Sequence, residues 1–140
     1  MASYLSSRRI LVVEDDPMVA DLLVTRLEIA GYRTALARDG VAAISMLGTE
    51  APTAVILDLN MPGTDGFDVL RYLQDRPDRR QTPVMVVSAR RSVDDVRRCI
   101  SLGASDYVSK PFEDHIFLKR VARLTRDRKE PTAGHADILI

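Results

Sequence analysis

Apolar residues along this chain follow two spacings in turn, short continuous runs and repeats of three or four residues. Continuous runs rich in β-branched residues are typical of strands buried on both faces of a parallel sheet. Repeats at i, i+3 and i+4 are typical of helices with one apolar face. The runs predict strands at Arg9–Val13, Tyr32–Ala37, Ala54–Leu57, Thr82–Val87 and Asp106–Ser109, the second being the weakest.

Five helices are predicted between and after these strands, with recognisable start and stop residues. Asp16 before Pro17 is a good N-cap followed by a proline suited to a first turn. Gly31 and Gly103 follow two of the repeats as C-terminal stops, and Pro77 ends the third helix. The apolar positions of the repeats are Val19, Leu22, Leu23 and Leu27; Ala43, Ile44 and Leu47; Phe67, Leu70 and Leu73; Val93, Val96 and Ile100; and Ile116, Phe117, Val121 and Leu124.

Regular alternation of strand and helix favours an α/β fold. Right-handed crossovers then give a parallel sheet with helices on both faces, a three-layer α/β/α sandwich. Periodicity leaves the strand order open between the two common arrangements. The 140 residues suit one domain. We predict a domain over residues 8–127 and a tail or linker over 128–140, where the apolar pattern fails and the composition resembles a linker.

Composition narrows the classes of function. Twenty basic and twenty acidic residues cancel, so no overall field favours nucleic acid. The single cysteine, Cys99, forms no internal disulfide, joins no Cys/His metal cluster, and is expected to be a small core residue of a cytoplasmic protein. No apolar run approaches the length of a membrane span. Bases exceed acids from Arg90 to Lys129, which fits either an acidic partner or solvated helix faces.

Polar residues follow four of the five predicted strands. Each alone has an ordinary explanation as a turn residue or a surface charge. The carboxyl ends of parallel strands, however, meet at one edge of the sheet, where open α/β folds bind ligands. We therefore expect one site built from Glu14, Asp15 and Asp16 after the first strand, Asp58 after the third, Ser88 after the fourth and Lys110 after the fifth.

The acidic members of this site predict a metal ion. Several carboxylates close together repel, and a hard divalent cation relieves that repulsion. Mg²⁺ is the natural choice because it accepts one or two carboxylates together with water and phosphate oxygens. We expect Asp15 and Asp58 to be direct ligands and Glu14 to act through a water, while Asp16 caps the following helix.

The remaining members predict phosphoryl chemistry. With neighbouring charges neutralised, the free oxygen of Asp58 can attack phosphorus and form an aspartyl phosphate. Phosphoryl transfer needs positive charge and hydrogen-bond donors on the transferring oxygens. Lys110 supplies a compact charge and Ser88 a hydroxyl. These residues are therefore our candidate catalytic groups.

Four stretches carry the site and extend across most of the chain. They are Val12-Val13-Glu14-Asp15-Asp16, Asp58-Leu59-Asn60-Met61-Pro62-Gly63, Ser88-Ala89 and Gly103-Ala104-Ser105-Asp106-Tyr107-Val108-Ser109-Lys110-Pro111-Phe112. Through them, the chain from about Arg8 to Asp127 resembles the receiver domain of bacterial two-component response regulators. The resemblance implies a flavodoxin-like sheet with strand order 2-1-3-4-5.

The resemblance also implies a role for each site residue. A cis peptide bond is implied between Lys110 and Pro111. Two residues depart mildly from the family pattern, since Ser88 stands where threonine is commoner, and Arg90 lies two residues further on, at the mouth of the site. The implied roles are phosphoacceptor for Asp58, acidic pair for Glu14 and Asp15, carbonyl ligand of Mg²⁺ for Asn60, switch residues for Ser88 and Tyr107, and phosphate-binding lysine for Lys110.

A signalling mechanism follows from the resemblance. Phosphorylation adds roughly two negative charges, which would draw Ser88 toward Asp58 and let Tyr107 turn inward, shifting a two-state equilibrium. The reshaped face of the fourth helix, fifth strand and fifth helix would meet a second copy, an effector domain or another protein. The phosphoryl donor would be a histidine kinase or a phosphotransfer protein. Basic residues on this face are Arg97, Arg98, Lys119 and Arg123.

Two alternatives use similar residues. A haloacid dehalogenase-type phosphohydrolase also forms an aspartyl phosphate, but it needs a second acid two residues after the nucleophile, where this chain has Asn60. A binding module without phosphorylation, or a flavin binder, would share the fold. The intact acids oppose the former, and the lack of a Ser/Thr-Gly-rich loop after the first strand opposes the latter.

Overall fold

The structure is a computed structural model that describes residues 9–61, 66–76, 82–90 and 92–129. Strands and helices alternate along these residues as the apolar spacing predicts. The turn expected at Pro62–Gly63, the break expected at Pro77 and the tail after Lys129 lie outside the described residues. The elements are β1 (Arg9–Val13), α1 (Pro17–Ile29), β2 (Arg33–Ala37), α2 (Gly40–Thr49), β3 (Ala54–Leu57), α3 (Gly66–Gln74), β4 (Val84–Ser88), α4 (Val93–Ser101), β5 (Asp106–Ser109) and α5 (Asp114–Lys129).

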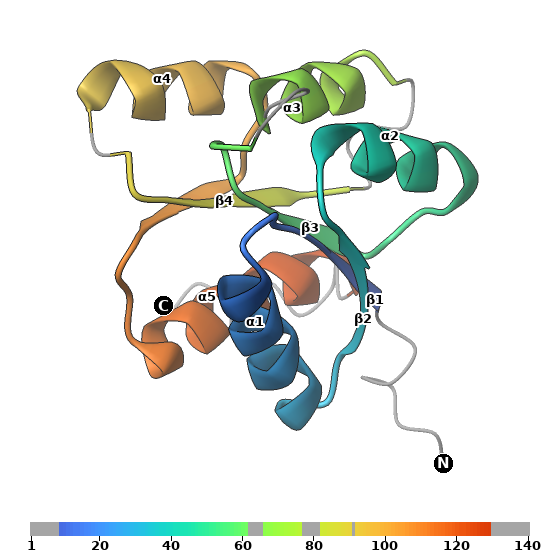
Figure 1. The fold of residues 1–140 in the computed structure, drawn as a ribbon, viewed down its shortest axis with the longest axis vertical. Helices are drawn as coiled ribbons and strands as arrows, with labels where there is room; N and C mark the ends of the chain where they lie inside the picture. The colour runs from blue at the N-terminus through green and yellow to red at the C-terminus, as the bar shows by residue number, and fades with distance from the viewer. Residues whose placement is uncertain (1–8, 62–65, 77–81, 91, 130–140) are drawn as a thin grey trace.

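The five strands form one parallel sheet in the order β2-β1-β3-β4-β5. Helices α2, α3 and α4 cover one face of the sheet, and α1 and α5 cover the other (Figure 1). The predicted three-layer sandwich and the flavodoxin-like order are therefore confirmed. All strands point the same way, so their carboxyl ends share one edge.

Alternate residues of the central strands feed two separate cores. Leu11 and Val13 of β1 pack on the face of α2, α3 and α4, around the buried Phe67. Ile10 and Val12 pack on the opposite face, around the buried Phe117 of α5. A strand covered by helices on both sides has no solvated face, which explains its continuous apolar sequence.

Helix ends follow the predicted chemistry. The Asp16 carboxylate accepts hydrogen bonds from the backbone N–H groups of Met18 at 2.9 Å and Val19 at 3.3 Å, so it caps α1 as expected. Gly31 and Gly103 follow α1 and α4 with φ of 103° and 98°. Only glycine adopts this left-handed conformation freely, which explains both stops. Helix α5 continues to Lys129, two residues beyond the predicted domain boundary.

Helix α4 departs from the expectation that each apolar stripe packs on the sheet. Val93 is 63% exposed and Ile100 is 51% exposed, so the predicted apolar positions face largely outward. Cys99 is the one described residue of α4 that is fully buried. The short helix is rotated so that the thiol, rather than the larger side chains, enters the core. In α1, Leu22 is likewise 39% exposed, while Leu23 and Leu27 are buried.

Burial controls the chemistry of Cys99. Removal from water raises its pKa to about 11, because the thiolate is desolvated, and Asp95 adds a smaller unfavourable charge. Since the thiolate is the reactive form, the folded protein should not react with iodoacetamide at mildly alkaline pH, whereas the urea-unfolded protein should react fully. Mass spectrometry of both samples measures the difference. Rapid labelling of the folded protein would contradict the buried placement.

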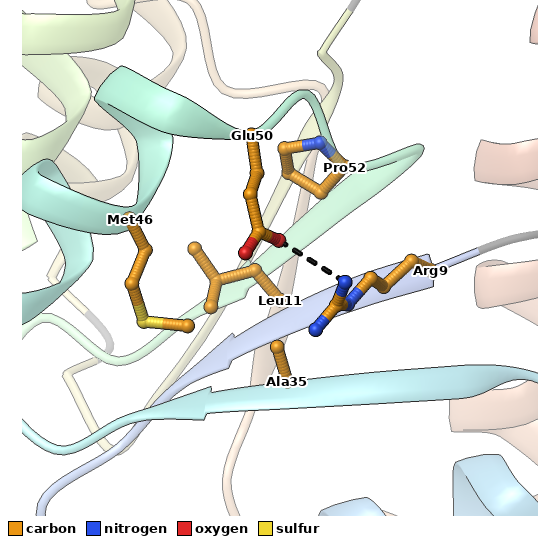
Figure 2. Close-up of a pocket in the computed structure, with 6 residues that line it drawn as sticks. All are labelled: Arg9, Leu11, Ala35, Met46, Glu50 and Pro52. Carbon is orange, nitrogen blue, oxygen red and sulfur yellow. Dashed lines mark ion pairs between the residues drawn. The ribbon is translucent and has the colours of Figure 1, made fainter.

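A small pocket lies at the edge of the sheet opposite the carboxyl ends of the strands, where β1 begins and α2 ends (Figure 2). An ion pair between Arg9 and Glu50, 3.3 Å long, borders it. Its volume of about 10 Å³ suffices for about one water molecule. This pocket is therefore too small to be a ligand site. The other lining residues are Leu11, Ala35, Met46 and Pro52.

No helix in the described parts of the chain is both long and apolar enough to cross a membrane.

Candidate functional site

The predicted site residues meet at the carboxyl edge of the sheet. Glu14 and Asp15 follow β1, and Asp58 follows β3, its neighbour in the sheet. Carboxylate oxygens of these three residues all lie within 4.8 Å of one another. Glu14 and Asp58 are buried, with 2% and 5% of their surface exposed. The sheet order thus brings together acids that are 44 positions apart in the sequence.

The backbone holds both acids in place. The N–H of Glu14 donates to the carbonyl of Ala37, at 3.0 Å, at the end of β2. The N–H of Asp58 donates to the carbonyl of Val13, also at 3.0 Å, which extends the pairing of β1 with β3. These bonds continue the ladder one residue past the strands. The acids therefore project from rigid strand ends rather than from free loops.

Lys110 places an ammonium among these carboxylates. Its Nζ lies 3.1 Å from Glu14 Oε1 and 3.8 Å from Asp58 Oδ1. Its backbone N–H donates to the carbonyl of Ser88 at 2.8 Å, which fixes the end of β5 against β4. The Lys110–Pro111 peptide bond is cis, as the resemblance implies. Lys110 therefore faces the site expected for it.

Burial raises the pKa of two of the acids. Desolvation raises the pKa of Asp58 above its usual 3.8, against the favourable charge of Lys110 and a hydrogen bond from the backbone N–H of Asn60. Desolvation also raises the pKa of Glu14 above its usual 4.5, with repulsion from Asp58 as the next cause. Three carboxylates with one ammonium leave an excess of negative charge. This oxygen-rich donor set fits a hard divalent cation.

The raised pKa values make a stability prediction for the metal-free protein. The folded state binds a proton at Asp58 more tightly than the unfolded chain does. The stabilisation from this protonated carboxyl is therefore complete below its usual pKa of 3.8, and it is lost as pH rises through the raised pKa of the folded state. Asp58→Asn removes the buried charge and should stabilise the protein at neutral pH by roughly 1 kcal/mol. The gain should shrink as pH falls toward 4 (about the usual carboxyl pKa).

Urea denaturation with a chelator present, at neutral and at acidic pH, measures this effect. A variant no more stable than the wild type at neutral pH would contradict it.

The two predicted switch residues lie in contact. Ser88 is fully buried at the end of β4. Desolvation raises the pKa of Tyr107 on β5, and a hydrogen bond with Ser88 opposes that shift. The Tyr107 hydroxyl also donates to the carbonyl of Arg90 at 2.6 Å. Both side chains therefore lie against the loop between β4 and α4.

Asn60 lies at the exposed mouth of the site. Its side-chain oxygen accepts a hydrogen bond from Arg90 Nε at 2.7 Å. The sequence places Arg90 at the mouth but gives no sign of this bond, because the two residues are 30 positions apart and meet only in the folded chain.

Gly66 is a second feature that the sequence does not reveal. A Cβ at this position would lie 2.6 Å from the carbonyl oxygen of Asp58 and 2.6 Å from the Cα of Leu59. The N–H of Gly66 also donates to the carbonyl of Leu59 at 3.1 Å. The first turn of α3 thus rests directly on the backbone that carries Asp58.

A family model and many curated relatives match this chain. The model of the response regulator receiver domain matches residues 10–122. Response regulator MprA of Mycobacterium bovis is 39% identical over 130 residues, which cover 93% of this chain and 56% of that protein. Response regulator PleD of Caulobacter vibrioides is 39% identical over 120 residues, which cover 86% and 26%. The chain thus spans about half of the first relative and about a quarter of the second.

Solved structures match as well. The signal receiver domain of a signal transduction histidine kinase from Syntrophus aciditrophicus has a TM-score of 0.81 and 36% identity, covering 88% of this chain and 93% of that one. The receiver domain of sensor histidine kinase PA1611 from Pseudomonas aeruginosa has a TM-score of 0.78 and 27% identity, covering 84% and 97%. That structure holds a magnesium ion in its active-site cleft.

The acidic cluster at the strand ends fits the phosphorylation site of such domains. The haloacid dehalogenase alternative finds no support in the fold or in these matches. This chain therefore belongs to the family of response regulator receiver domains.

Proposed function

We propose that Asp58 is the phosphoacceptor of this receiver domain. The observation that carries the proposal is the buried carboxylate of Asp58 at a strand end, with Lys110 Nζ 3.8 Å away and two further carboxylates beside it. An oxygen of Asp58 attacks the phosphorus of a phosphohistidine on a histidine kinase or phosphotransfer protein. The new O–P bond forms as the P–N bond breaks, and the imidazole nitrogen recovers the electron pair.

Lys110 and Ser88 serve the transferring group. The Lys110 ammonium lies 3.8 Å from Asp58 Oδ1 and offsets negative charge on the phosphoryl oxygens. The Ser88 hydroxyl is buried at the end of the adjacent strand β4 and donates to one of those oxygens. Later hydrolysis by water returns Asp58 to its free carboxylate and releases phosphate. Receiver domains act as such switches, and we propose no sustained substrate turnover here.

The site is suited to Mg²⁺. Asp15, Asp58 and the main-chain carbonyl of Asn60 would hold the ion directly, and Glu14 would contact it through a water. When bound, the ion neutralises the carboxylates and the transferring oxygens. The assignment of Mg²⁺ is supported by the chemistry of the donors. Three carboxylates lie together, and two of them are buried with raised pKa values. The Lys110 ammonium lies beside only Glu14 and Asp58 of these three. The magnesium ion in the related PA1611 domain agrees with this assignment.

The output face is proposed to be that of α4, β5 and α5. Tyr107 on β5 contacts the β4–α4 loop through its hydroxyl, so a change at Ser88 reaches this face. We propose that the face binds a second copy or an effector domain.

We also propose that the domain acts in the cytoplasm, where it contacts neither nucleic acid nor membrane. Residues 8–127 are proposed to form the domain, and residues 128–140 a tail or linker.

Single-turnover labelling tests the proposal. In one sample the protein is incubated with Mg²⁺ and phosphoramidate, and its intact mass is followed. In a second sample it is incubated with Mg²⁺ and p-nitrophenyl phosphate, and the released phosphate is measured. We expect at most one phosphoryl group per chain and no sustained release from p-nitrophenyl phosphate. Steady turnover of that generic substrate would instead indicate a phosphohydrolase.

A further inference from the structure

Arg90 connects the site to α4 through its side chain. Its Nε donates to Asn60 Oδ1 at 2.7 Å, and its Nη1 lies 3.5 Å from Asp95 Oδ1 in the first turn of α4. The guanidinium carbon also lies 5.4 Å from the centre of the Phe67 ring. One planar group therefore contacts the loop after β3, the start of α3 and the start of α4.

The contact with Asn60 continues to the phosphoacceptor. The backbone N–H of Asn60 forms a hydrogen bond with the Asp58 carboxylate and lowers its pKa. The side chain of the same residue accepts from Arg90. Three consecutive polar contacts thus lead from Asp58 through Asn60 and Arg90 to Asp95.

Helix α4 depends on such polar contacts more than its neighbours do. Cys99 is its one fully buried residue in the described chain, whereas α3 buries five residues over an equal length. A cation–π contact also holds α4, because the Arg98 guanidinium lies 3.9 Å from the centre of the Phe67 ring. An element with little buried apolar surface moves at low cost in free energy.

We propose that Arg90 is a positioning residue that couples the charge state of Asp58 to the placement of the first turn of α4. The coupling runs through Asn60 and Asp95 and adds to the contact between Ser88 and Tyr107. It rests on the proposed function of Asp58. Negative charge added at Asp58 attracts the guanidinium toward the site and away from Asp95, which releases the first turn of α4.

Coupling between two sites is reciprocal, so the inference can be tested by a change at Asp95 and a measurement of binding at Asp58. If an anion at Asp58 weakens the contact with Asp95, then removal of the Asp95 charge must strengthen anion binding at Asp58 by the same factor. A partly exposed ion pair such as Arg90–Asp95 contributes about a two- to fivefold effect. Asp94, next to Asp95 and exposed, supplies a control with the same change of charge.

The experiment measures the affinity of beryllofluoride with Mg²⁺ by titration calorimetry for the wild type, Asp95→Asn and Asp94→Asn. We expect Asp95→Asn to bind about two- to fivefold more tightly than Asp94→Asn. In an Arg90→Gln background, that difference between the two variants should vanish. Equal affinities of the two single variants, or a difference that survives Arg90→Gln, would overturn the inference.

Hydrogen exchange gives a second readout. Amides of the first turn of α4 should exchange faster in the wild type with beryllofluoride and Mg²⁺ bound than in the free wild type. In Arg90→Gln they should exchange fast in both states, while α1 stays unchanged. Exchange in α4 that responds to loading equally in both proteins would also overturn the inference. A wild type that binds no beryllofluoride would overturn the proposed function itself, which separates the two failures.

Discussion

Replacing Lys110 with methionine is expected to slow phosphorylation of Asp58 by about 100- to 1000-fold. Methionine has a similar length but no charge, so the oxygens of the transferring group lose the ammonium that lies 3.8 Å from Asp58 Oδ1. The buried carboxylates of Asp58 and Glu14 also lose the charge that opposes the rise of their pKa values on burial. The initial rate of labelling by phosphoramidate with Mg²⁺ measures the effect.

Lys110→Arg is the matched control for this variant. Arginine keeps the charge, although its wider planar group fits a site built for a compact ammonium less well. We expect its labelling rate to lie between those of the wild type and Lys110→Met. Labelling of Lys110→Met at the wild-type rate would show that Lys110 serves the structure but not the transfer.

Gly66→Ala is expected to destabilise the fold by about 1–3 kcal/mol and to slow phosphorylation as well. The added Cβ would lie 2.6 Å from the backbone of both Asp58 and Leu59. Backbone atoms cannot move aside as a flexible side chain can. Either α3 must move away or the turn that carries Asp58 must shift. Urea denaturation and the labelling rate measure the two consequences.

Gly48→Ala provides a control with the opposite sign. Gly48 lies in α2, and a Cβ there would lie 3.6 Å from the Tyr72 hydroxyl, an ordinary contact. Alanine is the better helix former, so this variant should be more stable than the wild type by about 0.5–1 kcal/mol. If both variants changed stability in the same direction, the tight approach at Gly66 would not be the cause.

Much of the fold could be predicted from local patterns. Each β-branched run became a strand, and the caps at Asp16, Gly31 and Gly103 ended or began helices as expected, because these signals act within a few residues. Strand order came from the family resemblance, since periodicity carries no information on it. The face of α4 was predicted wrongly. In a nine-residue helix with few apolar residues, the contacts of α4 with β5 and with Phe67 of α3 decide which side is buried.

The candidate site divides in the same way. Glu14, Asp58, Ser88 and Lys110 could be predicted because each follows a strand, and parallel strand ends meet at one edge. The bonds made by Arg90 could not be predicted, since they depend on how a long side chain reaches across 30 residues of sequence to Asn60.

Binding of beryllofluoride in the presence of Mg²⁺ tests most directly the claim that Asp58 accepts the phosphoryl group. Asp58→Asn keeps the shape of the side chain but removes its nucleophilic oxygen. Asp16→Asn is the control, because it removes a nearby charge while asparagine still caps α1. We predict that the wild type and Asp16→Asn bind with similar affinity and that Asp58→Asn does not bind. Unchanged binding by Asp58→Asn would contradict the claim.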